Sequence, residues 1–323
     1  IDGSKGVEAQ TIKLFKVCVM RGIPIFTFIN KMDREARSPF DLLDEIESEL
    51  AIKVCPMTWP IGMGERFKGV YNLFKSTLSL FKSDKQHVAH DVVEIESLSD
   101  PRLSEYLGEA QADQLREEST LVTEVYPDPD LDAYRKGLQA PVFFGSALNN
   151  FGVNELLRCF IEIAPCPGEV LAKERIVSPF EPTFSGFVFK IHANMDPNHR
   201  SSIAFVKVCS GRFVRNEYYR HIRLDKKLRF ASPTAFMAQK KELLEEAFAG
   251  DIVGLPDTGN FKIGDTLTEG EELHFRGLPS FSPELFCYID NADPMKQKQL
   301  AKGIDQLMDE GVAQLFVNQF NGR

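Results

Sequence analysis

The first 65 residues alternate between patterns typical of amphipathic helices and of buried strands. Residues 5–22 repeat apolar side chains at helical spacing, and Gly22 supplies the end of the predicted helix. Residues 23–30 are almost wholly apolar, which is typical of a parallel strand covered on both faces. One face of the predicted helix is formed by Val7, Leu14, Phe15 and Cys18.

A second helix and a second strand follow in the same order. Ser38 is suited to cap this helix, with Pro39 at its first position and Asp41 in its first turn. Residues 52–62 then predict another strand, and the alternation of helix and strand favours a parallel α/β sheet. The side chains of the second helix that are expected to face the core are Leu42, Leu43, Ile46 and Leu50.

Between about residues 65 and 140 the pattern changes, which indicates an insertion within the α/β domain. Short strands are predicted at 67–74, 76–82 and 87–95, and an acidic helix at 101–125. The α/β alternation resumes with a buried strand at 141–147 and a closing helix. We therefore expect residues 1–165 to form one partial α/β domain. The closing helix should bury Leu156, Leu157, Phe160 and Ile161.

The second half of the chain has a β pattern. Residues 166–182 contain three prolines, directly after Pro165, and little periodicity, so they predict a linker. Residues 183–277 contain short strands separated by Gly and Asp turns, a set that favours a closed barrel. Residues 278–323 begin a third, α+β domain that is cut short. Its amphipathic helix should point inward with Leu300, Ile304, Leu307 and Met308.

Composition narrows the possible partners. The net charge is −9 and the pI is near 5.3, so the electrostatic field of the whole protein does not attract nucleic acid. DNA is therefore not expected as a partner. No apolar run reaches about 18 residues, so a membrane is not expected either. The first ten residues do not resemble a signal peptide. Because the chain begins without Met, we expect it to be a fragment.

The cysteines and histidines do not suggest a metal site. The six cysteines are scattered without a Cys-x-x-Cys pair, and most lie in apolar segments. They therefore predict reduced, buried thiols in a cytosolic protein. His87 and His90 are three apart, but no Cys or carboxylate cluster accompanies them, whereas zinc needs three or four ligands. We expect no metal ligands in this chain.

The strand at 23–30 ends in an unusual polar group, Asn30-Lys31-Met32-Asp33. Open α/β sheets bind ligands at the carboxyl ends of their strands. A carboxylate at Asp33 could accept from both the N1–H and the exocyclic amine of guanine, a donor pair that adenine lacks. The Asn30 amide suits guanine N7, and the Lys31 stem could cover the purine face. Alternatively, Asn and Asp at a strand end simply cap a turn.

A second group, Gly145-Ser146-Ala147-Leu148, ends the later buried strand. Small residues in a tight turn would let a backbone N–H approach guanine O6, and the Ser146 hydroxyl could brace the Asp33 carboxylate. By itself this group would fit an ordinary strand-to-helix turn. Together, and in this order, the two groups predict a guanine pocket.

These motifs resemble the base-recognition pair of the translational GTPases. Residues 58–62 and 67–73 resemble the elongation factor G type, and the finer similarity is to the bacterial class II peptide chain release factors (release factor three). Residues 26–34, 57–62, 186–211 and 293–311 carry that similarity. The discriminating segment is Asn194-Met195-Asp196-Pro197 with His199-Arg200, where elongation factor G has a Gly-containing turn.

The resemblance implies a GTP-dependent, cytoplasmic factor that works on the ribosome, with ribosomal RNA and proteins as partners. After peptide release such a factor drives the class I release factor off, and GTP hydrolysis ends its own stay. It also implies the carboxyl-terminal part of a P-loop-type GTPase domain at residues 1–165. Guanine recognition of GTP or GDP falls on Asn30, Lys31, Asp33, Ser146, Ala147 and Leu148.

The machinery for hydrolysis is missing from the sequence. No Gly-x-x-x-x-Gly-Lys-[Ser/Thr] loop occurs, and the family's Asp-x-x-Gly switch with its catalytic His is absent too. In GTPases, almost all the catalysis comes from the loop that binds the phosphates and from the Mg²⁺ ion. We therefore assign no catalytic residue, expect the Mg²⁺ ligands and GTPase activity in the parent protein, and expect this fragment alone to be inactive.

Other interpretations remain open. Another translational GTPase, of the elongation factor G or ribosome-protection type, would show the Gly-containing turn in place of residues 198–200. A non-catalytic ribosome-binding module would use the barrel and insertion only for contacts. The basic segment 212–229 could bind RNA phosphates, or it could be an ordinary charged face exposed to solvent. The His199-Arg200 loop could likewise contact RNA, or it could be only a turn. The segment's cations are Arg212, Arg215, Arg220, Arg223, Lys226, Lys227 and Arg229.

Overall fold

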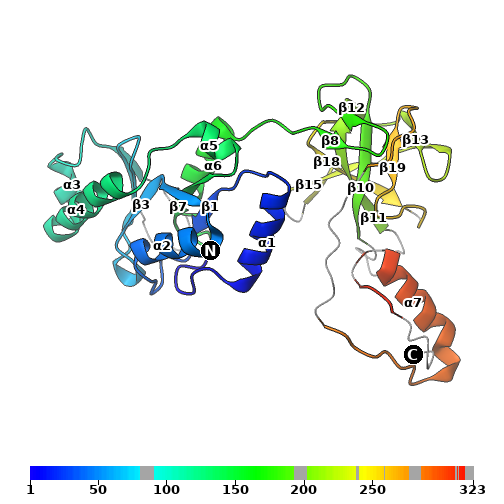
Figure 1. The fold of residues 1–323 in the computed structure, drawn as a ribbon, viewed down its shortest axis with the longest axis horizontal. Coiled ribbons are helices and arrows are strands. Elements are labelled where there is room, and N and C mark those ends of the chain that lie inside the picture. The colour runs from blue at the N-terminus through cyan, green and yellow to red at the C-terminus, as the bar shows by residue number, and fades with distance from the viewer. Residues whose placement is uncertain are drawn as a thin grey trace. The chain divides into compact units, whose positions relative to one another are not determined.

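The computed structural model describes residues 1–80, 91–192, 202–237, 240–257, 259–275, 285–309, 311 and 313–316. The chain divides into two compact units, residues 1–165 and 166–323 (Figure 1). The first contains a parallel sheet and the second a large antiparallel one. Each unit is described by itself.

The first unit is built on a parallel sheet with the strand order β1-β7-β2. In the register of β1 against β7, Ile29 lies opposite Phe144, so the two predicted recognition motifs leave neighbouring strands at the same edge. The strands are β1 (Thr27–Ile29), β2 (Lys53–Pro56) and β7 (Gln139–Phe144). The accompanying helices are α1 (Ala9–Met20), α2 (Pro39–Leu50), α5 (Leu131–Arg135) and α6 (Val153–Ile163).

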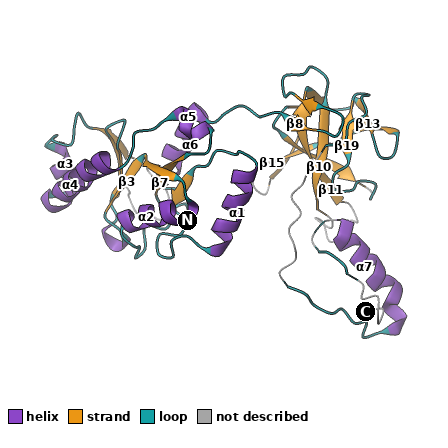
Figure 2. Cartoon of the chain, in the orientation of Figure 1, coloured by secondary structure: helices purple, strands orange, loops and turns teal. Residues whose placement is uncertain are grey.

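The predicted insertion contains an antiparallel sheet of order β3-β4-β5-β6 and two helices that lie side by side (Figure 2). Residues 52–62, predicted as one strand, form two, because the chain leaves the parallel sheet at Met57 and enters this second sheet. The elements are β3 (Thr58–Ile61), η1 (Gly64–Arg66), β4 (Gly69–Asn72), β5 (Thr77–Leu80), β6 (Asp91–Glu94), α3 (Arg102–Leu107) and α4 (Glu109–Val125).

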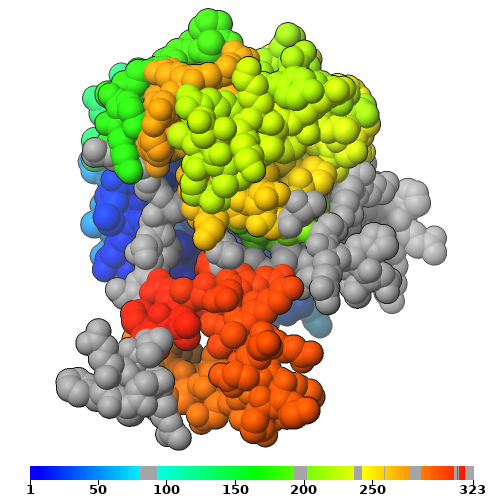
Figure 3. Space-filling view, turned by 90° about the vertical axis from the view of Figure 1, so that its right-hand side faces the viewer, coloured from blue at the N-terminus to red at the C-terminus, as the bar shows by residue number. Residues whose placement is uncertain are grey.

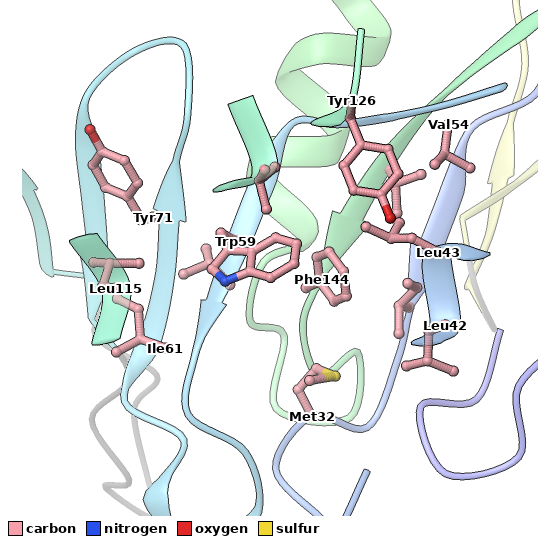
Figure 4. Packing of buried hydrophobic residues seen from close by; sticks show 14 of the residues in the cluster. Met32, Leu42, Leu43, Val54, Trp59, Ile61, Tyr71, Leu115, Tyr126 and Phe144 are labelled. Atoms are coloured by element: carbon pink, nitrogen blue, oxygen red, sulfur yellow. The ribbon is translucent and has the colours of Figure 1, made fainter. Parts of the chain in front are cut away.

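One hydrophobic core joins the parallel sheet, α2 and the antiparallel sheet. Trp59 is fully buried between Phe40 and Phe144, and its indole N–H donates to Glu118 on α4 at 2.7 Å. Met32 lies in the same cluster, close to Phe144 (Figure 4). The inward face predicted for the second helix is confirmed for Leu42, Leu43, Ile46 and Leu50.

The second unit is a curled antiparallel sheet of eight strands, ordered β14-β13-β19-β10-β11-β18-β15-β16, with a small β12–β17 pair. Its atoms, yellow-green to gold, form one rounded mass in Figure 3. Stacked and tilted aromatic rings of Phe184, Phe213, Tyr219 and Phe230 fill the core. The strands are β10 (Ser185–His192), β11 (Ser202–Ser210), β12 (Arg212–Val214), β13 (Tyr218–His221), β14 (Lys226–Arg229), β15 (Thr234–Met237), β16 (Lys240–Leu243), β17 (Glu246–Phe248), β18 (Ile252–Asp257) and β19 (Thr266–Thr268).

Segments on either side of this sheet also have structure. Residues 166–182, predicted as a linker, contain the hairpin of β8 (Val170–Leu171) and β9 (Ile176–Val177). Arg175 binds both Glu181 and Glu271 through its guanidinium and so ties the hairpin to the segment after β19. Beyond residue 285 the described elements are η2 (Pro294–Lys296) and α7 (Gln297–Asp309).

Three predicted burial patterns differ from the structure. Helix α1 buries no residue fully, and on α6 only Cys159 is buried while Ile161 is 81% exposed. The expected inward residues of α7 are likewise half-buried or exposed. These faces are partly covered, since Phe160 contacts the Phe26 ring and Val7 and Phe15 pack against the core of the first unit. Among the six free cysteines, Cys55, Cys159 and Cys209 are buried, whereas Cys166 and Cys287 are exposed, contrary to the prediction that most are buried.

Candidate guanine-recognition site

The backbone of Asn30 is fixed by the first residues of the chain. Asp2 forms a parallel bridge with Asn30, in which the Asn30 amide donates to the Ile1 carbonyl at 2.8 Å. The Gly3 amide donates to the Asn30 carbonyl, also at 2.8 Å. Asn30 is therefore held in extended backbone immediately after β1, at the carboxyl edge of the sheet.

The Asn30 side chain connects the two predicted motifs. Its Oδ1 accepts hydrogen bonds from the backbone amides of Lys31 and Ala147, each at 2.8 Å. The second bond spans 117 residues of sequence. With Oδ1 doubly engaged, the Nδ2 group is the part of Asn30 that can donate to a purine nitrogen such as guanine N7.

Lys31 adopts a backbone conformation that is unusual for its residue type. Its φ angle is 70°, in the left-handed region, which costs a non-glycine residue free energy. Its ammonium donates to Oδ2 of Asp2 at 2.6 Å, and Ser4 donates to Oδ1 of the same carboxylate through both its amide and its hydroxyl. These hydrogen bonds, that from Lys31 foremost, hold the pKa of Asp2 well below its ordinary value.

Met32 anchors the loop, a role that the sequence analysis did not assign. Its amide donates to the Gly145 carbonyl at 3.1 Å, and its carbonyl accepts from the Gly64 amide at 2.9 Å. Its side chain is fully buried in the core beside Phe144 (Figure 4). The sequence signal for this role was an apolar residue, Met32, within the otherwise polar group Asn30-Lys31-Met32-Asp33. Side chains alternate in direction at the end of a strand, so Met32 can point into the core while its neighbours point toward the sheet edge.

Asp33 is half-buried and follows this anchor. Within the described part of the chain its carboxylate makes no hydrogen bond or ion pair, in contrast to the carboxylate of Asp2. An acceptor held at a ligand edge without a protein donor is suited to bind two donors of one ligand. A carboxylate in this state is what the expected pairing with the two donors of guanine requires.

The second motif forms a tight turn that closes on itself. The amide and carbonyl of Ser146 pair with the carbonyl and amide of Phe151 at 3.0 and 2.9 Å. Gly145 is required here, since a Cβ atom would overlap the Phe151 carbonyl oxygen and lie 2.8 Å from the Phe28 ring. The turn therefore presents its amides over β1.

The Ser146 hydroxyl is buried and accepts a hydrogen bond from the Asn149 amide group at 2.9 Å. In the described residues no hydrogen bond joins Ser146 to Asp33, so the predicted brace is not formed directly. Asn149 was not singled out from the sequence, although an Asn two residues after Ala147 is a common turn-forming signal.

The amides left for a ligand lie at the tip of the turn. Because the Ala147 amide binds Asn30, it is not available to a base carbonyl. For the backbone N–H groups of Leu148 and Asn149, the described residues offer no acceptor. The Leu148 side chain is 83% exposed, so this residue contributes backbone rather than a hydrophobic contact.

The basic segment of the second unit is largely paired within the protein. Arg212, Arg215, Arg220 and Arg223 bind Glu246, Glu245, Asp225 and Asp265, respectively. The exposed cations on the edge strand β14 are Lys226, Lys227 and Arg229, and Arg229 lies over the Tyr218 ring. This pairing reduces the local positive charge, and within the described part of the segment only β14 remains as a basic edge. The His199-Arg200 loop lies outside the described residues.

Neither a metal centre nor a membrane span is found in the parts of the chain that the structure describes. No group of three or more His, Cys, Asp and Glu side chains there is arranged to hold a metal ion. His87 and His90 lie outside the described residues. Of the described helices, none combines the length and apolarity that crossing a bilayer requires.

Three family models match consecutive parts of the chain. The elongation factor Tu GTP binding domain matches residues 1–166, elongation factor G domain 2 matches residues 183–270, and the C-terminal domain of class II release factor RF3 matches residues 275–323. The first of these covers more than half of the chain.

Individual proteins agree with this division. The chain is 51% identical over 317 residues to a peptide chain release factor 3 of Symbiobacterium thermophilum. The aligned region covers 98% of this chain and 60% of that protein. A crystal structure of a Thermus thermophilus protein superposes with a TM-score of 0.72 at 20% identity, over 100% of this chain and 48% of the other. The chain thus spans about half to three-fifths of the length of these proteins.

Proposed function

The chain belongs to the translational GTPases with an elongation factor Tu type of GTP-binding domain, in their class II release factor branch, and on this premise we propose that residues 1–165 recognise the guanine base of GTP and GDP. Asn30, Lys31 and Asp33 supply one half of the base pocket. Ser146, Ala147 and Leu148 supply the other. The pocket reads the base and contributes nothing to phosphate chemistry.

The observation that carries this proposal is the Asn30–Ala147 hydrogen bond. It brings the two motifs to one place although 117 residues separate them. An ordinary turn cap would bind amides of its own loop only, as Asn30 does with Lys31. The cross-strand bond therefore favours a built ligand site over the alternative of two unrelated turns.

Base selection follows from the hydrogen-bonding groups. The Asp33 carboxylate accepts from N1–H and the exocyclic amine of guanine, and the Asn30 Nδ2 donates to N7. The backbone amides of Leu148 and Asn149 would donate to O6. Adenine presents an acceptor and a donor where guanine presents the reverse, so its binding would leave buried polar groups without partners. Sites of this kind discriminate by roughly 10⁴-fold.

For the whole protein we infer a role in translation termination. The RF3 C-terminal match and the 51% identity to a peptide chain release factor 3 support it. Such a factor uses GTP on the ribosome to release class I release factors after peptide release. Ribosomal RNA and proteins are then its direct partners, with the β14 edge (Lys226, Lys227 and Arg229) as a candidate RNA contact.

Hydrolysis requires residues that these 323 do not include. The sequence contains no phosphate loop, and we assign no Mg²⁺ ligand to it. Because positioning and charge neutralisation of the phosphates dominate catalysis in this class, we infer that this chain alone neither hydrolyses GTP nor binds it tightly. Turnover by the purified chain above the buffer rate would contradict this inference.

A ribosome assay tests the proposed role. The full-length protein should release a class I factor from post-termination ribosomes with GTP, and its Asp33→Asn variant should do so with XTP but not with GTP. If the wild type releases nothing with any nucleotide, the termination role is wrong. A wild type that instead promotes translocation with GTP would favour an elongation factor.

A further inference from the structure

Asp2 lies next to the base-recognition loop but belongs to neither predicted motif. It starts a tight turn, in which its carbonyl accepts from the Lys5 and Gly6 amides at 3.2 and 2.9 Å. Its backbone bridges Asn30, and its side chain faces Lys31. The turn thus lies beside β1 at the same sheet edge as the recognition residues.

The ion pair between Asp2 and Lys31 is the notable contact of this turn. The Nζ–Oδ2 distance is 2.6 Å, and the Asp2 side chain is 11% exposed while that of Lys31 is 46% exposed. The anchor is therefore the more buried partner, and the long lysine stem reaches it from the surface. Both oxygens of the carboxylate are used, since Ser4 binds the other one.

We propose that Asp2 is a positioning residue for guanine recognition, which holds the Lys31 ammonium so that the lysine stem lies across the purine face. This proposal rests on the base-recognition function proposed above. Asp2 itself touches no base. It acts through Lys31, whose flexible side chain would otherwise lose rotamer entropy when it covers a ligand.

The anchor is itself well supported. The Gly3 amide binds the Asn30 carbonyl, and the Gly3 carbonyl accepts from the Arg37 amide at 2.9 Å. Glu45 on α2 accepts from the Val7 amide at 3.2 Å and pairs with the Arg37 guanidinium. The turn is thereby fixed to both β1 and α2, so the Asp2 carboxylate is presented in one place.

Charge on Asp2 is also secure. The hydrogen bonds from Lys31 and Ser4 keep its pKa well below the ordinary value, so the carboxylate stays ionised at every pH at which the protein would work. The ion pair is therefore a permanent feature of the site and not a pH-dependent one.

The test uses the full-length protein and measures its dissociation constants for GDP and for inosine diphosphate, which lacks the exocyclic amine. Asp2→Asn keeps an oxygen acceptor for Ser4 but removes the charge that binds Lys31. We expect it to weaken both nucleotides equally, by about three- to fivefold, because a partly exposed ion pair contributes up to about 1 kcal/mol. The matched control Ser4→Ala keeps the ion pair and the amide hydrogen bond to Asp2, so it should weaken both nucleotides less than Asp2→Asn does.

A double-mutant cycle shows whether Asp2 acts through Lys31. In a Lys31→Met background, Asp2→Asn should cause no further loss. Asp2→Glu should restore part of the affinity. Amide NMR spectra of the 323-residue variant chains should be unchanged outside residues 1–37, which separates positioning from loss of the fold.

Two results would overturn the positioning role while leaving the base pocket intact. One is unchanged or tighter nucleotide binding by Asp2→Asn. Tighter binding would mean that the ion pair opposes nucleotide binding and must break before the nucleotide binds. The other is an equal loss with and without Lys31. By contrast, a failure of Asp33→Asn to change base preference would reject the base pocket itself.

Discussion

The side-chain oxygen of Asn30 accepts a hydrogen bond from the backbone amide of Ala147 at 2.8 Å. One amide side chain thereby joins the ends of two adjacent parallel strands, β1 and β7. The same oxygen accepts from Lys31, so it also fixes the start of its own loop. The base recognition proposed for this chain requires this junction, because Asp33 and the turn amides would have to face a single base.

Replacing Asn30 should destabilise the first unit. Asn30→Ala leaves the Ala147 and Lys31 amides without their acceptor, which costs about 1–2 kcal/mol of unfolding free energy. Urea unfolding followed by fluorescence of Trp59 measures this cost, since Trp59 is the only tryptophan in the chain and lies in the core of that unit. Asn30→Asp is the matched control, because it keeps the acceptor oxygen and should be nearly as stable as the wild type.

The turn after β7 should not tolerate a larger residue at Gly145. In Gly145→Ala the new methyl group overlaps the Phe151 carbonyl and crowds the Phe28 ring, so the turn must shift at a cost of about 1–3 kcal/mol. The same urea experiment measures it. Gly168→Ala serves as the control, since a Cβ atom there meets nothing within 4 Å. Equal stability of the two variants would show that the turn is not as tight as described.

A buried ionic group makes the second unit sensitive to acid. His221 is fully buried, its Nε2 lies 3.1 Å from Asp265, and Arg223 binds the same carboxylate at 2.6 and 2.8 Å. Burial alone would raise the pKa of Asp265, but the hydrogen bonds from Arg223 and the Lys262 amide, together with the adjacent His221 ring, outweigh it and lower the pKa to about 2.

The sign of the effect follows from the lowered pKa. The stabilisation is fully present above the unfolded-state value of 3.8 and is lost as the pH falls toward 2. We expect the second unit to lose about 2 kcal/mol across this window. Amide NMR signals of β10 and β11 during acid titration provide the measurement. In Asp265→Asn this loss should be absent, and an unchanged acid profile in that variant would reject the assignment.

Much of the first unit could be predicted from the sequence, because its local patterns and its tertiary contacts agree. Helix α2 shows this, with a Pro at its start and four apolar side chains that are all buried. The two polar groups at the ends of β1 and β7 could also be found in the sequence, since each follows a strongly apolar strand. Their order along the chain does not reveal the bond between Asn30 and Ala147, which depends on β1 and β7 being neighbours.

The features that the sequence did not predict depend on contacts distant in the chain. The break at Met57 between β2 and β3 is invisible to periodicity, since the residues from Val54 to Ile61 are almost all buried on both sides of it. The roles of Asp2 and Asn149 likewise arise from side chains that meet only after folding. The apolar face of α6 was predicted to be buried but is largely exposed, because an amphipathic pattern indicates an apolar face without saying what covers it.

The most direct test of guanine recognition is the base preference of the full-length protein with Asp33→Asn. The wild type should bind GDP in preference to both ADP and XDP. In the variant, the amide can donate to the xanthine O2 and accept from N1–H, so preference should move from GDP to XDP, with a change in their affinity ratio of up to roughly 10⁴-fold. If the variant binds GDP and XDP in the same ratio as the wild type, Asp33 does not read the base and the account of this site is wrong.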